Sequence, residues 1–77
     1  MKQFIEFIAK NLVDNPDTVV VDEKQTDQKK IVYTLKVGAE DVGKVIGKQG
    51  KTAQAIRILL TAVAAKEGKR AILEILD

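Results

Sequence analysis

The chain has 77 residues, of which 13 are Lys or Arg and 11 are Asp or Glu, and it contains no Cys and no His. A chain of this length forms one domain, residues 1–77, with a small core that no disulfide can support. Ser is absent as well, so the usual nucleophiles, general bases and nitrogen or sulfur metal ligands are missing. We therefore expect no enzyme and no metal or cofactor, and the lack of Cys and of a secretory segment predicts a cytoplasmic protein without a membrane partner.

The N-terminal segment is predicted to form a helix over residues 2–13. Apolar residues recur there at helical spacing, and Asn15 and Pro16 follow where a helix must end. We expect Phe4 and Phe7 to face the core.

Two strands are predicted next, at residues 18–23 and 31–37. Every second residue of the second strand is apolar, which places four side chains on one face: Ile31, Tyr33, Leu35 and Val37. Because a short polar segment joins the strands, we expect an antiparallel hairpin whose apolar face meets the helices.

The second half of the chain is predicted to be mostly helical. A short helix is expected over residues 39–45, a long one over 51–66 that ends near Gly68, and a last strand over 71–76. The element order is α-β-β-α-α-β. A helical crossover makes the second and third strands parallel neighbours, so the fold class is α+β with a three-stranded mixed sheet and helices on one face.

Between the two predicted helices lies a turn suited to phosphate. Gly47 and Gly50 bracket two polar residues, and glycine lets another molecule approach the main chain closely. The long helix begins just after the turn. Its unpaired N–H groups and positive dipole end would stabilise an anion near Lys51 and Thr52.

Basic charge is concentrated around this turn. Residues 42–66 carry five Lys and Arg and no acid, a charge of +5, whereas residues 1–41 sum to −2 and residues 67–77 to −1. Such a segment is typical of a protein that binds a polyanion. The phosphate-binding loop of NTPases and the dinucleotide fingerprint would both require Gly at position 45, which is Val45, so neither applies.

The sequence V-I-G-K-Q-G from Val45 to Gly50, set between two helices and followed by Ile56, resembles the signature of a KH domain. The element order resembles the type II form of that fold. Over essentially the whole chain, the sequence is similar to small bacterial single-KH RNA-binding proteins of the KhpA type. In that family a GXXG loop clamps the backbone of about four nucleotides. One departure is Ala53, where family members often carry a larger aliphatic residue.

The resemblance implies a binding site for single-stranded RNA, with single-stranded DNA as the less favoured alternative, and a role in post-transcriptional regulation or as an RNA chaperone. Backbone N–H groups and Lys side chains would hold the phosphates, and unstacked bases would lie in an apolar groove. The expected RNA-binding residues are Val42, Lys44, Ile46, Gly47, Lys48, Gln49, Gly50, Lys51, Thr52, Ile56 and Arg57.

An alternative function is that of a protein-interaction subunit. The predicted long helix is apolar on two sides: one face holds Ala53, Ile56, Leu59, Leu60, Val63 and Ala64, and the opposite face holds Ala55, Ile58, Ala62 and Ala65. We expect the second face to be the interface of a homodimer, or of a heterodimer with another RNA-binding protein. Both functions can hold together.

Overall fold

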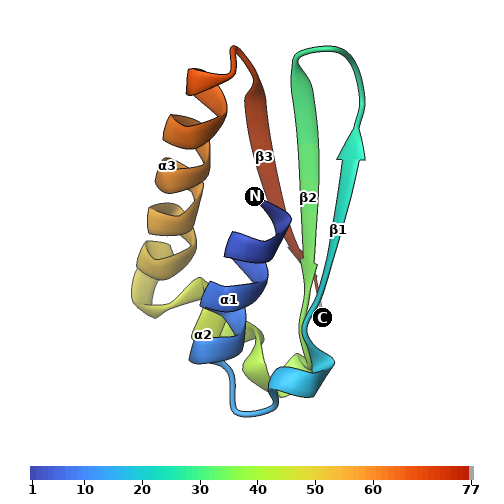
Figure 1. The fold of residues 1–77 in the computed structure, drawn as a ribbon. Coiled ribbons are helices and arrows are strands. Elements are labelled where there is room, and N and C mark those ends of the chain that lie inside the picture. Colours follow the sequence, from blue (N-terminus) through green and yellow to red (C-terminus); the bar gives the residue numbers. More distant parts are fainter. Residues whose placement is uncertain (77) are drawn as a thin grey trace.

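The computed structural model describes residues 1–76, and Asp77 lies outside the described part. Three α-helices and three strands follow the predicted order: α1 (Lys2–Leu12), β1 (Val20–Gln25), β2 (Lys30–Lys36), α2 (Val42–Ile46), α3 (Lys51–Lys66) and β3 (Arg70–Leu76). Figure 1 shows α1 and α3 on the same side of the sheet. The α+β class and the mixed sheet are confirmed. No helix in residues 1–76 has the length and apolar character to cross a membrane.

The sheet has the strand order β1-β2-β3. β1 and β2 are antiparallel, with Val21 opposite Leu35, whereas β2 and β3 are parallel, with Tyr33 opposite Leu73. β1 begins two residues later than predicted, because a short 3-10 turn, Pro16–Thr18, comes first. The crossover through α2 and α3 thus places β3 beside β2, as predicted.

The alternation of buried and less buried side chains along β2 determines which face of the sheet is buried. Ile31, Tyr33, Leu35 and Val37 are all buried, as predicted, and they pack with residues from α1, α3 and β3. Burial raises the pKa of the Tyr33 phenol above its ordinary value, and the Glu23 carboxylate raises it further. The core is therefore built on one face of the sheet, beneath the helices.

One prediction for α1 is wrong. Phe7 is 68% exposed and Phe4 is also exposed, so neither is a core residue. The buried stripe runs instead through Ile5, Ala9 and Val13, which are four residues apart and lie on one side of the helix. Phe7 is two positions after Ile5, about 200° around the helix, and so points away from the sheet.

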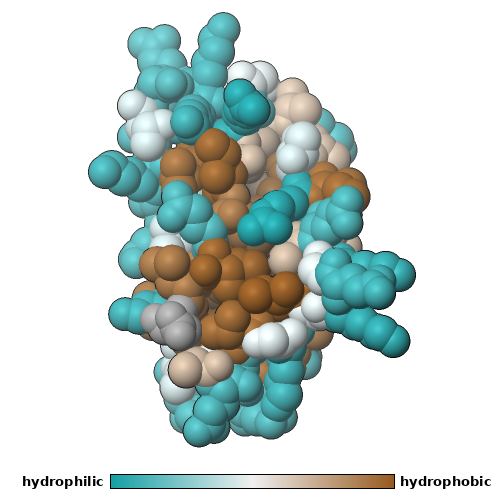
Figure 2. All heavy atoms as spheres, turned by 180° about the vertical axis from the view of Figure 1, so that it is seen from behind, coloured by the Kyte–Doolittle hydropathy of each residue, from teal (hydrophilic) through white to brown (hydrophobic). Residues whose placement is uncertain are grey.

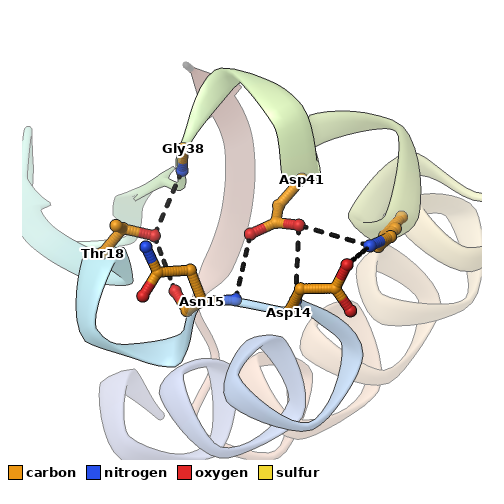
Figure 3. A network of polar contacts seen from close by, with 6 residues as sticks. Asp14, Asn15, Thr18, Gly38 and Asp41 are labelled. Atoms are coloured by element: carbon orange, nitrogen blue, oxygen red, sulfur yellow. Dashed lines mark hydrogen bonds and ion pairs between the residues drawn. The ribbon is translucent and has the colours of Figure 1, made fainter.

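A buried carboxylate joins α1 to α2 (Figure 3). Asp41 is only 3% exposed, and its two oxygens accept the backbone N–H groups of Asp14, at 3.3 Å, and Asn15, at 3.2 Å. The predicted helix over 39–45 divides at this residue: Ala39–Asp41 forms a 3-10 turn, and α2 starts at Val42. Asp41 therefore ties the segment that follows α1 to the residue that precedes α2.

Candidate functional site

The turn between α2 and α3 is held in a left-handed conformation. Gly47, Gln49 and Gly50 have φ of 78°, 59° and 74°. The Gly47 N–H donates to the Gly43 carbonyl at 2.9 Å, and the Gly50 N–H donates to the Gly47 carbonyl at 3.1 Å. These bonds close the end of α2 and the turn itself, so the two side chains between the glycines are carried on a defined backbone.

Glycine is required at position 47 because of its positive φ and because a side chain there would clash with Thr52. A Cβ on this residue would lie 2.1 Å from Thr52 Oγ1 and 2.9 Å from Thr52 N, distances that real Cβ atoms do not reach. A Cβ on Gly50, by contrast, would have no atom of residues 1–76 within 4 Å other than those of the adjacent residues, so only the φ of Gly50 favours glycine. Gly47 therefore allows the start of α3 to pack directly against the turn.

Lys48 in the turn and Lys51 just after it have no carboxylate partner within residues 1–76. Lys48 and Lys51 are exposed, as is Gln49, and within residues 1–76 the ion pairs involve Lys44 alone among the cations. The Lys51 N–H at the start of α3 donates to the Lys48 carbonyl. No side-chain cap bonds to the N–H groups that follow, so within residues 1–76 the first turn of α3 keeps donors that a ligand can use. The turn thus offers backbone donors, a helix dipole and free positive charge at one place.

Lys44 was predicted to bind the ligand too, but the structure engages it elsewhere. Its ammonium pairs with the Asp14 carboxylate and lies 3.5 Å from Asp41 Oδ1. The hydrogen bond to Asp14 is the main reason that the pKa of Lys44 is raised. Because Asp14 and Asp41 already offset its charge, Lys44 has less to offer a phosphate than Lys48 or Lys51.

The predicted apolar groove is an open surface. Val42 is half-buried and Ile46 is 38% exposed, so both can present methyl groups to a ligand. Ile56, predicted to line the groove, is only 3% exposed and belongs to the core, so it supports this surface from beneath. Residues 1–76 form no pocket. Figure 2 shows apolar atoms grouped at mid-height on the side opposite to the view of Figure 1, with hydrophilic side chains around them.

Arg57 lies at the junction of α3 and β3. Its guanidinium Nη2 donates to the Leu73 carbonyl at 3.4 Å. On β3, the Arg70 N–H and the Leu76 carbonyl bond to backbone groups on the β2 side of the strand. The backbone groups of successive residues in a parallel strand point to alternate sides, and Leu73 is an odd number of residues from both. The Leu73 carbonyl therefore points to the free edge of β3. Arg57 is thus held along the free edge of β3, where its charge is available without a carboxylate partner in the described residues.

The outer side of α3 carries a broad apolar strip. Ile58 is 61% exposed, and the predicted interface residues Ala55, Ala62 and Ala65 are exposed around it. Leu59 and Val63, predicted on the inner face, are exposed too, which corrects that prediction. The buried stripe of α3 is narrow, because it packs mainly on the edge strand β3, and it consists of Ala53, Ile56, Leu60 and Ala64.

Comparison with known proteins gives consistent results. A family model described as "KhpA/KhpB, KH domain" matches residues 2–75. "RNA-binding protein KhpA" of Caldanaerobacter subterraneus subsp. tengcongensis is 57% identical over 76 residues, and the protein of that name from Clostridium acetobutylicum is 55% identical; each match covers 99% of this chain and 100% of the relative.

A more distant relative from Aquifex aeolicus, with the same name, is 49% identical over 77 residues, which are 100% of this chain and 96% of that protein. No solved structure gave a significant match. These relatives are named for RNA binding and not for catalysis, in line with the residue types that the sequence lacks. The chain belongs to the KhpA/KhpB family of KH domains.

Proposed function

We propose that the protein binds single-stranded RNA through the turn from Gly47 to Gly50 and the apolar surface beside it, and serves as a post-transcriptional regulator or RNA chaperone in the cytoplasm. One observation carries the proposal. The turn is exposed, left-handed at three residues, and continuous with the uncapped N-terminus of a 16-residue helix. Lys48 and Lys51 have no carboxylate partner in the described part of the chain, and relatives over the full chain length are named RNA-binding proteins.

Each part of the site has a separate role in this proposal. The N–H groups at the start of α3 hold a phosphate, and Lys48 and Lys51 add attraction that weakens as salt rises. Val42 and Ile46 give unstacked bases an aliphatic surface, which paired bases in a duplex could not reach. The described structure has no aromatic side chain at the turn itself, so phosphate contacts dominate the affinity.

Single-stranded RNA should bind more tightly than a duplex of the same sequence, and its affinity should fall as salt rises. The logarithm of the binding constant should decrease linearly with that of the salt concentration, by about 0.7 per phosphate contact. Fluorescence anisotropy with labelled RNA across a salt series measures both effects. A preference for the duplex, or affinity that does not respond to salt, would contradict the proposed site.

A second function is favoured by the strip on α3. We propose that the protein pairs through this helix, either with a second copy or with another RNA-binding protein. Ile58 is the most exposed large apolar side chain of α3, and small Ala side chains around it allow a partner helix to approach closely. Pairing would raise the avidity of a domain that grips few nucleotides by joining two such sites.

Replacing Ile58 with Glu should yield monomers that remain folded, because the side chain lies outside the core. Burying one isoleucine contributes about 1.5 to 3 kcal/mol, and a carboxylate at the same contact would oppose association. Gln25→Glu, which adds a charge at an exposed position of β1, the edge of the sheet away from α3, is the matched control and should leave association unchanged. Light scattering at several concentrations measures the mass. A wild-type protein that stays monomeric and recovers no partner from lysate would contradict the proposal.

A further inference from the structure

The sheet brings together basic residues that are far apart in the sequence. Lys30 on β2 and Arg70 on β3 are direct cross-strand neighbours. Both alternate with buried or half-buried residues that pack on the core, so their side chains project from the face of the sheet that the helices leave uncovered, here called the open face. On the same face, Lys24 of β1 lies opposite Val32, one row further along.

Lys30 and Arg70 have no acidic partner in the described residues, since every ion pair there involves Lys44. The acids of the open face, Asp22 and Glu74, lie in the row of Thr34. That row is four residues from Lys30, or about 13 Å along the strand. Like charges placed directly opposite each other across two strands are destabilising. An anion bound between Lys30 and Arg70 would remove that cost.

More cations surround this pair. Lys29 immediately precedes β2 and Lys69 immediately precedes β3, and the Arg70 N–H donates to the Lys29 carbonyl, so the two segments are in contact. We call the five residues Lys24, Lys29, Lys30, Lys69 and Arg70 the basic corner. Three acids lie near it: Glu23 on the helix side of β1, Asp27 in the hairpin loop and Glu67 at the end of α3. The corner remains positive after they are counted.

The basic corner and the turn lie at opposite ends of α3. Figure 1 shows the β1–β2 loop and the connection from α3 to β3 at one end of the molecule, whereas α3 begins at the other. A helix of 16 residues spans about 24 Å. Between the two ends run α3 and the free edge of β3, where Arg57 is held. An RNA strand that leaves the turn along this edge would pass Arg57 and reach Arg70.

We propose that the basic corner binds phosphates of the same single-stranded RNA, in the segment that flanks the nucleotides held at the turn. The inference rests on the proposed function of the turn and extends it to a longer footprint. The charge of the corner suits a polyanion, and the side chains of Val32 and Ile72 beside it offer the aliphatic parts of nucleotides a surface. RNA too short to leave the turn would not contact the corner.

The test compares RNA of about four nucleotides, the length that one KH domain clamps, with RNA of about twelve. Wild-type protein should bind the longer RNA more tightly. The double variant Lys30→Gln/Arg70→Gln should lose most of this gain and bind the short RNA as before. With the longer RNA, the slope of the logarithm of the binding constant against that of the salt concentration should be smaller in magnitude by about 1.4 for this variant, since two phosphate contacts are removed. Lys2→Gln/Lys10→Gln, which removes two exposed charges from α1, is the matched control and should retain the gain.

Three results would overturn the inference: a length gain that persists in Lys30→Gln/Arg70→Gln, an equal loss for both RNA lengths, or an equal effect of the α1 control. Thermal unfolding should show the corner variant at least as stable as wild type, because a repulsive pair is removed. A failure of the proposed function would give a different result. Substitutions at Lys48 and Gln49 would then leave the affinity for both RNA lengths unchanged, whatever the result for Lys30→Gln/Arg70→Gln.

Discussion

Replacing both Lys48 and Gln49 with Asp is expected to abolish binding to single-stranded RNA while the fold stays intact. Both side chains are exposed on the turn, so the change removes one positive charge and adds two negative ones where phosphate is expected. Each unit charge about 4 Å from a phosphate is worth about 1 kcal/mol in water. Three such changes amount to about 3 kcal/mol, or more than about a hundredfold in Kd. An RNA titration by fluorescence anisotropy measures the loss.

The chain contains a matched control for this variant. Lys2 and Gln3 are likewise an exposed Lys-Gln pair, but they lie on α1. Lys2→Asp/Gln3→Asp makes the same change in net charge and should weaken RNA binding far less than the turn variant. Circular dichroism checks that both proteins are folded. Undiminished RNA affinity in a folded turn variant, or equal losses in the two variants, would exclude the turn as the phosphate-binding element.

Gly47→Ala is expected to disrupt the turn and lower the free energy of unfolding by about 2 to 6 kcal/mol. The residue combines a φ that L side chains rarely adopt, which costs about 1 to 3 kcal/mol, with overlap between the new Cβ and Thr52, which costs a similar amount. For a domain of this size, each kcal/mol lowers Tm by about 4 to 8 °C. Thermal unfolding followed by circular dichroism should show the decrease, and RNA affinity should fall as well.

Gly43→Ala provides the comparison for this substitution. Gly43 lies within α2, and a Cβ there would meet no atom within 4 Å. Ala favours a helix over Gly by about 0.8 to 1 kcal/mol, so this variant should be as stable as wild type or more stable. If Gly47→Ala unfolded at the wild-type temperature, the close packing of Thr52 against the turn could not be what requires glycine.

Local patterns in the sequence were enough to predict the framework of the fold. The strict alternation from Ile31 to Val37 identifies the buried face of β2, and the two helices between β2 and β3 determine that these strands run parallel. The turn was found from the spacing of Gly47 and Gly50 and from the absence of acids around it. These features depend on neighbouring residues, whose geometry a single sequence can indicate.

Features that depend on distant contacts were not predictable in this way. Lys44 looks like a free cation in the sequence, but it pairs with Asp14, which is 30 residues away. Phe7 was expected in the core because it is aromatic, but only the packing of α1 on the sheet shows that its side chain faces away from the core. The basic corner could not be predicted from the sequence, because Lys30 and Arg70 are 40 residues apart and fall in different segments of the charge count. Only the sheet register brings them together.

The location of the RNA can be measured directly by nuclear magnetic resonance. Isotope-labelled protein titrated with single-stranded RNA of about four nucleotides should show amide shift changes concentrated from Ile46 to Thr52, with smaller ones along the free edge of β3 near Leu73. The account predicts little change on the outer side of α3, around Ile58. Shifts that gather on that helix face and leave the amides of the turn unaffected would contradict the claim that the turn binds RNA.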